Sequence, residues 1–255
     1  DRHDPGQPVR GADPPSHPRS MAAAQDQRPS VAVLPSRVAV ARGRQASAVA
    51  WAGLAGFAAS FVLVRARLSD AFDLAVTIKL QRGRAPWIER LMRLASWPGF
   101  PPQSRVIPAS IALALAAARL RLEAAGFLAA WGTAAIATLA KALMDRPRPV
   151  AGTDLRVVAA PLGGSSFPSG HVITYVGIYG YSAYLVYSLV PSPPLRRAGV
   201  AGLVGLICLV GPSRIHQGHH WFTDVVASYL LGVSYLIGVA SLYRRAKAGA
   251  SGLRP

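Results

Sequence analysis

Apolar residues in this 255-residue chain gather into long uncharged runs rather than into the one-sided stripes of soluble helices. The first run, 46–64, has no charged residue and is long enough to cross about 30 Å of hydrocarbon as a helix. Five more runs follow, at 106–118, 124–140, 172–190, 198–210 and 225–243. The pattern therefore predicts an all-α protein, a transmembrane bundle of six helices.

Two of these runs, 106–118 and 198–210, are shorter than the usual spanning length. Taken alone, each could form an interfacial or a buried helix instead of a span. Arginine side chains at their ends can reach the head groups and so extend the length that each helix covers. These arginines are Arg105, Arg119, Arg196 and Arg197.

The segment between the first two runs has a different pattern. From Pro86 to Ala95, apolar residues recur on one helical face, and Glu89, Arg90 and Arg93 occupy the opposite face. This arrangement is typical of a helix that lies in the plane of the membrane surface. We therefore expect an interfacial helix between spans 1 and 2.

The chain is strongly basic, with 28 Lys and Arg against 11 Asp and Glu and a net charge of +17. Such a balance fits nucleic acid, an anionic membrane surface or a phosphorylated substrate. No aromatic residue occurs in 1–45 to stack on bases, so we predict no nucleic-acid partner. If the N-terminus is cytosolic, every inner segment carries a basic cluster, as the positive-inside rule requires, although 65–105 outside is basic too.

Three domains follow from composition. Residues 1–45, rich in Pro, Arg, Ser and Gln, are expected to be a disordered basic N-terminal tail, in which Met21 is a candidate native start. Residues 46–243 form the six-span domain, and 244–255 form a basic C-terminal tail. The single cysteine, Cys208, excludes an internal disulfide and a cysteine-based zinc site.

Polar clusters stand where the third span ends, within 141–149, and where the fourth and sixth begin, within 166–171 and 213–224. Each alone has a structural explanation, as a head-group anchor, a capped turn or a helix-surface pair. Six alternating helices would bring all three to one membrane face. Four of the six histidines and several guanidinium groups would then meet there.

Such a set of groups suits a phosphate. Arginine binds phosphate oxygens through paired, charge-assisted hydrogen bonds, and the free amides of a helix start favour an anion. A two-metal phosphatase would need several carboxylates, but few occur in the two outer loops that carry these clusters. We therefore expect no metal and no cofactor, with histidine or serine as the nucleophile. The carboxylates there are Asp145, Asp154 and Asp224.

These clusters carry a family resemblance over roughly 46–243. Together they resemble the three signatures of the type 2 phosphatidic acid phosphatase (PAP2) superfamily, in the order found in its six-helix membrane members. Vanadium haloperoxidases share the signatures but are soluble proteins, whereas the runs of this chain are of membrane length. The signatures read Lys141-x6-Arg148-Pro149, Pro168-Ser169-Gly170-His171 and Ser213-Arg214-x5-His220-x3-Asp224.

The resemblance implies a role for each motif residue. His220 would attack phosphorus to form a phosphohistidine, Asp224 would hold its other ring nitrogen, and His171 would protonate the leaving oxygen. The spacing from Arg214 selects His220 over His219 as the nucleophile, so we expect His219 to be structural or peripheral. His216 and Arg146 also lie beside the motif positions. The phosphoryl oxygens would be bound by Lys141, Arg148, Ser169, Gly170 and Arg214.

The expected protein is a multi-pass lipid phosphatase of the cell (inner) membrane, with its site on the extracytoplasmic face. Its substrate would enter sideways from the bilayer, with an undecaprenyl-type diphosphate favoured over a phosphatidic acid-like lipid. Two alternatives stay open: a vanadate-dependent haloperoxidase-like enzyme and a non-catalytic membrane scaffold. A transporter would place ionisable groups within the spans, whereas here they lie at the ends.

Overall fold

A computed structural model of the chain describes residues 36–152, 155–157 and 163–250. Contacts divide the chain into two units, Asp1–Ala41 and Arg42–Pro255. The first unit is described only at 36–41, the opening turns of the first helix. Most of the predicted tail 1–45, including Met21, therefore lies outside the described residues. The predicted C-terminal tail is helical as far as Ala250.

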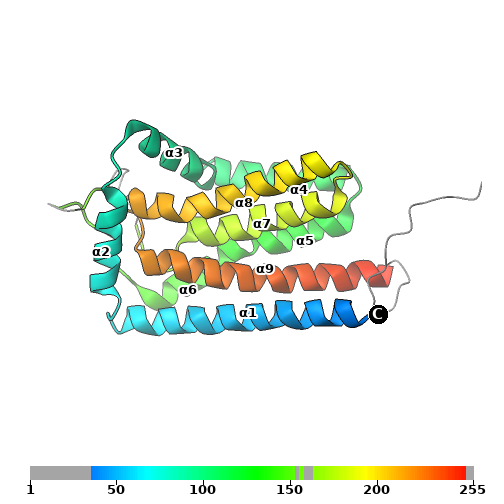
Figure 1. The fold of residues 1–255 in the computed structure, drawn as a ribbon, viewed down its shortest axis with the longest axis horizontal. Coiled ribbons are helices and arrows are strands. Elements are labelled where there is room, and N and C mark those ends of the chain that lie inside the picture. Colours follow the sequence, from blue (N-terminus) through cyan, green and yellow to red (C-terminus); the bar gives the residue numbers. More distant parts are fainter. Residues whose placement is uncertain (1–35, 153–154, 158–162, 251–255) are drawn as a thin grey trace, which may run out of the picture. The chain divides into compact units, whose positions relative to one another are not determined.

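The described residues form helices and no strand, which confirms the predicted all-α class (Figure 1). The elements are α1 (Ser36–Arg65), α2 (Asp70–Gln81), α3 (Pro86–Ser96), the 3-10 turn η1 (Trp97–Gly99), α4 (Gln103–Ala117), α5 (Arg121–Trp131), α6 (Thr133–Met144), α7 (Gly170–Leu189), α8 (Pro193–His216) and α9 (Phe222–Ala250).

Four described segments are long and apolar enough to cross a membrane, where the sequence pattern predicted six. The second of them joins α5 and α6, which meet at Gly132. The run 198–210, short in the sequence, lies within the 24 residues of α8 and so reaches spanning length. Helix α4 is the shorter apolar helix, with 15 residues. The four segments are Arg42–Arg65, Arg121–Met144, Pro193–His216 and Phe222–Ala250.

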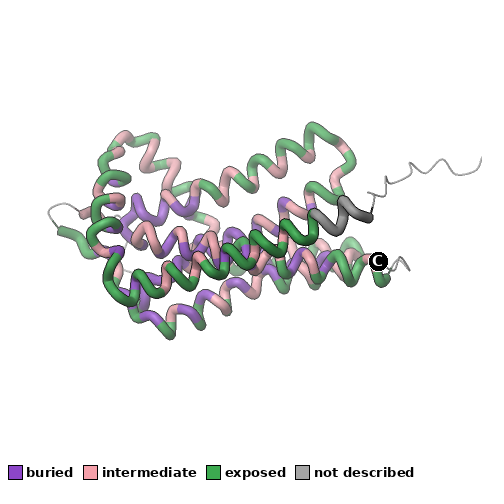
Figure 2. The backbone as a smooth tube through the Cα atoms, turned by 60° about the horizontal axis from the view of Figure 1, so that its bottom comes forward, coloured by how far each residue is buried: buried purple, intermediate pink, exposed green. Residues whose placement is uncertain are grey.

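Helix α7 forms the centre of the bundle. It packs against α5, α6, α8 and α9, and buried positions occur on every side of it. Its tyrosines Tyr175 and Tyr181 are almost completely buried, so their hydroxyls face protein rather than lipid. A Cβ at Gly177 would overlap the backbone of Ala130, which shows how closely α5 and α7 approach. Helix α1, in contrast, is largely exposed (Figure 2).

Two short helices, α2 and α3, lie between α1 and α4 in the chain, at one end of the bundle (Figure 1). Helix α3 coincides with the helix that the pattern from Pro86 predicts. Helix α2 has no counterpart in the prediction. Its buried residues are the polar Asp73, Thr77 and Gln81, whereas Phe72 is exposed. Its polar face therefore turns inward, which reverses the usual relation between hydrophobicity and burial.

Candidate active site

The three polar clusters meet at the end of the bundle where α2 lies (Figure 1). Lys141 belongs to the last turn of α6 and His171 to the first turn of α7. Arg214 belongs to the last turn of α8, and His220 lies in the short connection to α9. The structure thus brings together residues that the sequence separates by up to 79 positions (220 minus 141).

A tight turn after α8 brings the histidines back beside Arg214. Gly218 has φ +74°, a conformation that favours glycine, and a Cβ there would overlap the backbone of Arg156. The turn is held by the His219 amide, which donates to the Arg214 carbonyl over 3.1 Å. Glycine at 218 therefore permits both the reversal and the close approach of a neighbouring segment.

The His220 imidazole is buried, with 2% of its surface exposed. Its Nδ1 lies 2.7 Å from the Ser166 carbonyl, which can only accept a hydrogen bond, so Nδ1 carries the proton. Nε2 lies 3.3 Å from an Nη of Arg148. Burial and the charges of Arg214, Arg148 and Lys141 hold the pKa of His220 well below its usual value. The ring is therefore neutral near pH 7, with its lone pair on Nε2.

The Asp224 carboxylate lies beside this ring, but its short hydrogen bonds are to other groups. Its Oδ2 is 3.5 Å from Nδ1 of His220 and accepts a 2.9 Å hydrogen bond from the Trp221 amide. Its Oδ1 accepts a 2.7 Å hydrogen bond from Arg146. The family resemblance led us to expect Asp224 as the partner of Nδ1. The shortest contact of that nitrogen is instead the carbonyl of Ser166.

Arg146 connects Asp224 to a carboxylate that the sequence analysis did not single out. Its Nη2 donates to Asp73 over 2.7 Å, and Asp73 also accepts from the amide and the hydroxyl of Thr223, at 2.8 and 2.7 Å. Asp73 and Asp224 are completely buried, so Arg146 pairs with two carboxylates in the protein interior. Asp73 is one of three acidic residues in the basic segment 65–105, with Asp70 and Glu89, so composition alone does not single it out.

The predicted phosphate-binding residues surround His220. Lys141 Nζ donates to the Ser165 carbonyl over 2.6 Å, and Arg148 donates to the His219 carbonyl over 2.8 Å. Arg214 is completely buried and lies beside His219 and Gln217. Several buried polar atoms have no hydrogen-bond partner among the described residues, as expected where an anion binds. They include Nε of Arg148 and Arg214, Oγ of Ser169 and Nε2 of His171.

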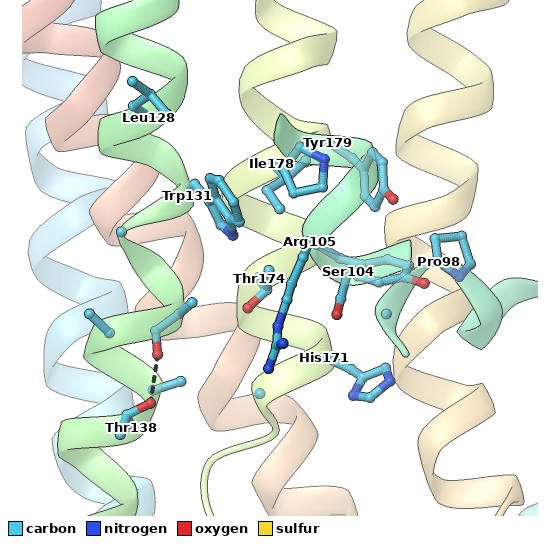
Figure 3. A pocket seen from close by; sticks show the side chains of 18 of the residues that line it. Pro98, Ser104, Arg105, Leu128, Trp131, Thr138, His171, Thr174, Ile178 and Tyr179 are labelled. Carbon is cyan, nitrogen blue, oxygen red and sulfur yellow. Dashed lines mark hydrogen bonds between the residues drawn. The ribbon is translucent and has the colours of Figure 1, made fainter. Parts of the chain in front are cut away.

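His171 stands on the other side of this cluster. Its ring packs edge-on against Phe100, with centroids 4.7 Å apart, and against Gly99. Together with Lys141 and Gly170 it lines a cavity of about 580 Å³ between η1, α4, α5, α6 and α7 (Figure 3). A ring nitrogen of His171 could thus reach a ligand that occupies this cavity.

The other two histidines of the three polar clusters are bound to protein groups. Nδ1 of His219 contacts the guanidinium of Arg214, and burial with the charges of Arg214 and Arg148 lowers the pKa of His219 to about 3. Nδ1 of His216 lies 3.2 Å from the Leu80 carbonyl of α2. Asp145 ends α6 in a left-handed conformation, and Asp154 lies outside the described residues.

Comparison with known proteins relates the chain to one superfamily. The model of the PAP2 superfamily matches residues 123–248. Phosphatidylglycerophosphatase B of Bacillus subtilis (strain 168) is 36% identical over 69 residues, which are 27% of this chain and 34% of that protein. The match thus spans about a third of the relative's length.

Among solved structures, the chain is similar to the crystal structure of a transmembrane PAP2-type phosphatidylglycerolphosphate phosphatase from Bacillus subtilis. The TM-score is 0.68 at 21% sequence identity, and the match covers 77% of this chain and 96% of the other. The two proteins therefore share a fold.

Proposed function

The chain belongs to the PAP2 superfamily through residues 123–248, and on that premise we propose that it is an integral membrane lipid phosphatase. One observation carries the proposal. The neutral Nε2 of buried His220 faces Arg148, within a cluster of cations and buried donors that lack acceptors. A phosphoryl group would supply those acceptors and place phosphorus beside a nucleophile.

In the proposed reaction, Nε2 of His220 attacks phosphorus as the bond to the lipid oxygen breaks. His171 gives its proton to that oxygen, which leaves a phosphohistidine and a lipid alcohol or a lipid with one phosphate fewer. Water then attacks the phosphohistidine, with His171 as base, and releases inorganic phosphate. Asp224, 3.5 Å from Nδ1 of His220, stabilises the positive charge that the ring acquires.

The remaining motif residues bind the transferred group. Lys141, Arg148 and Arg214 bring positive charge to its oxygens, and Ser169 and the Gly170 amide add hydrogen bonds at the start of α7. The charge on these oxygens changes as the bonds to phosphorus form and break. Donors already fixed by the fold stabilise that change without reorganising.

The proposed chemistry requires no metal. Among the described residues, no three His, Cys, Asp or Glu side chains come together as a metal site. The acidic groups near His220 are Asp224 and Asp73, and both are bound by Arg146. Cations of the protein would thus take the role that divalent metals have in two-metal phosphatases.

We place the protein in the cell (inner) membrane with six crossings, to which α4 and α7 contribute along with the four long apolar segments. The site would face the extracytoplasmic side. The junction of α4 and α5 and the start of α8 lie at the far end of the bundle (Figure 1). They carry Arg119 and Arg121 at the junction, and Arg196 and Arg197 in the first turns of α8, as the positive-inside rule requires of cytoplasmic segments. Helix α3 would lie at the membrane surface, since Trp87 and Leu94 expose 69% and 61% of their areas.

The test is phosphate release by purified protein in detergent from a panel of lipid phosphates. The panel contains undecaprenyl diphosphate, phosphatidic acid and phosphatidylglycerophosphate, the last because of the relatives' names. We expect release in the presence of EDTA, inhibition by vanadate, and an acid-labile phosphoprotein when a ³²P-labelled substrate is quenched. No release from any lipid would favour the scaffold, and halide oxidation with bound vanadate would favour the haloperoxidase.

A further inference from the structure

The lining of the cavity beside His171 is apolar over one part of its length and polar over another. Leu128, Trp131 and Ile178 make one part of its wall apolar, and His171 lies at the opposite end (Figure 3). Gly170, which directly precedes His171, also lines the cavity, as does Lys141, whose side chain would lie 3.8 Å from a Cβ at Gly170. Since His171 is the proposed proton donor to the leaving oxygen, the lipid that leaves would occupy this cavity. Its tail would follow the apolar wall towards the bilayer.

A further cation enters this cavity from α4. The Arg105 side chain extends from α4 past Thr174 towards the end where His171 lies (Figure 3). In the sequence alone, Arg105 is indistinguishable from a head-group anchor. In the structure, its side chain points into the cavity instead.

Arg105 has no acidic neighbour there. None of the residues that line the cavity is an aspartate or a glutamate. No ion pair joins Arg105 to any residue of the described chain. Arg105 is itself exposed, and its side chain points to the end of the cavity where His171 lies (Figure 3). Because no lining residue is acidic, a phosphate that enters there would be the partner of this guanidinium, whose planar fork matches phosphate oxygens.

We infer that Arg105 binds a second phosphate of the substrate, the one that stays on the lipid after the terminal phosphate has moved to His220. The inference rests on the proposed function and deepens it. His220 and His171 act at the terminal phosphate, so a group beyond the leaving oxygen lies on the cavity side, where Arg105 is. The bonds of the retained phosphate do not change.

Two kinds of lipid carry such a group. In a polyprenyl diphosphate, the retained phosphate is bonded directly to the leaving oxygen. In a phosphatidylglycerophosphate, it is a phosphodiester separated from the terminal phosphate by glycerol. A phosphatidate or a polyprenyl monophosphate has no second phosphate, and its hydrolysis would not engage Arg105. Arg105 would thus select lipids that have two phosphates over those that have one.

The experiment compares kcat/KM for these four lipids, as two pairs with matched tails, between the unaltered protein and Arg105→Gln. We expect the unaltered protein to prefer the two-phosphate member of at least one pair. Arg105→Gln should lower kcat/KM for that member by about 10- to 100-fold, the usual effect of a hydrogen bond to a charged group. Activity on the monoesters should stay within about threefold, which also reports that the variant is folded.

Two further variants sharpen the result. Arg105→Lys should recover part of the lost preference, because it keeps the charge but not the planar fork. Arg90→Gln removes an exposed arginine from the nearby α3 and should leave all four rates unchanged. A loss confined to the polyprenyl pair would assign the diphosphate, and a loss confined to the glycerolipid pair would assign the phosphodiester.

The inference is overturned if Arg105→Gln lowers the rates of all four lipids equally, or if the unaltered protein prefers neither two-phosphate lipid. Both results leave a working lipid phosphatase and so leave the proposed function intact. Absence of release from every lipid by the unaltered protein would instead overturn the proposed function itself.

Discussion

Asp73 accepts a 2.7 Å hydrogen bond from the guanidinium of Arg146, although the two residues are 73 positions apart. Through Arg146 the segment between the first two spans reaches Asp224, and through Thr223 it holds the start of α9. Helix α2 is therefore part of the scaffold of the site. The proposed nucleophile lies at the end of this chain of buried contacts.

Asp73→Asn should destabilise the protein, because it removes one of the two completely buried carboxylates that balance Arg146. Loss of one partner of a buried ion pair typically costs about 3 kcal/mol or more. Thermal unfolding in detergent would measure the change. Asp70→Asn is the control, since Asp70 is half-exposed and lies 3.6 Å from the same guanidinium. Equal shifts in the two variants would contradict the role of Asp73.

His220→Ala should abolish phosphate release, with a loss of at least about 10³-fold, because the nucleophile is gone. His219→Ala should keep most of the activity, since Nδ1 of His219 contacts Arg214 and its ring does not face Arg148 as His220 does. Single-turnover assays with ³²P-labelled lipid would measure both the rate and the phosphoenzyme. Labelled phosphoenzyme in His220→Ala, or similar rates in the two variants, would refute the assignment.

The sequence predicts that the motif residues meet, because the membrane limits where charged motifs can lie. Clusters at the ends of apolar runs, with helices that alternate in direction, leave few arrangements, and the structure brings Lys141, His171 and His220 to one end of the bundle. The spacing rule that distinguishes His220 from His219 also has a counterpart in space, since Arg148 contacts the Nε2 of His220.

Helix α2 and its role could not be predicted in the same way. Hydrophobic patterning assumes that apolar residues point inward, but α2 buries Asp73, Thr77 and Gln81 and exposes Phe72 and Leu74. The hydrogen bond from His220 to the Ser166 carbonyl could not be predicted from the sequence either. Every residue has a backbone carbonyl, so sequence letters carry no signal for it.

Acid should destabilise the protein in a way that depends on His219. Its pKa is about 3 in the fold, against about 6.5 for a free histidine, so the unfolded chain binds a proton that the folded one does not. Above about pH 6.5 the His219 ring is neutral in both states, and its ionisation does not reduce the free energy of unfolding. As the pH falls below this value, the unfolded chain takes up the proton and the free energy of unfolding decreases. At pH 5 the decrease is about 2 kcal/mol. Thermal midpoints at pH 7 and pH 5 would measure it, and His219→Gln should show a smaller difference. Identical pH dependence in both proteins would contradict this expectation.

Gly99→Ala should impair proton transfer to the leaving group. A Cβ at Gly99 would overlap the His171 ring and lie 2.8 Å from its Nε2, and the ring is also packed against Phe100. The ring must therefore move away from the position in which it protonates the leaving oxygen. Gly202→Ala is the matched control, because no atom lies within 4 Å of the added methyl group in α8.

The readout for Gly99→Ala compares two leaving groups. Hydrolysis of a lipid phosphate, whose alkoxide leaves poorly, should fall by about 10²-fold or more. Hydrolysis of p-nitrophenyl phosphate, whose leaving group needs no proton, should fall much less. Gly202→Ala should change neither rate. If Gly99→Ala lowered both rates equally, the ring of His171 would be holding the phosphate or the fold rather than supplying the proton.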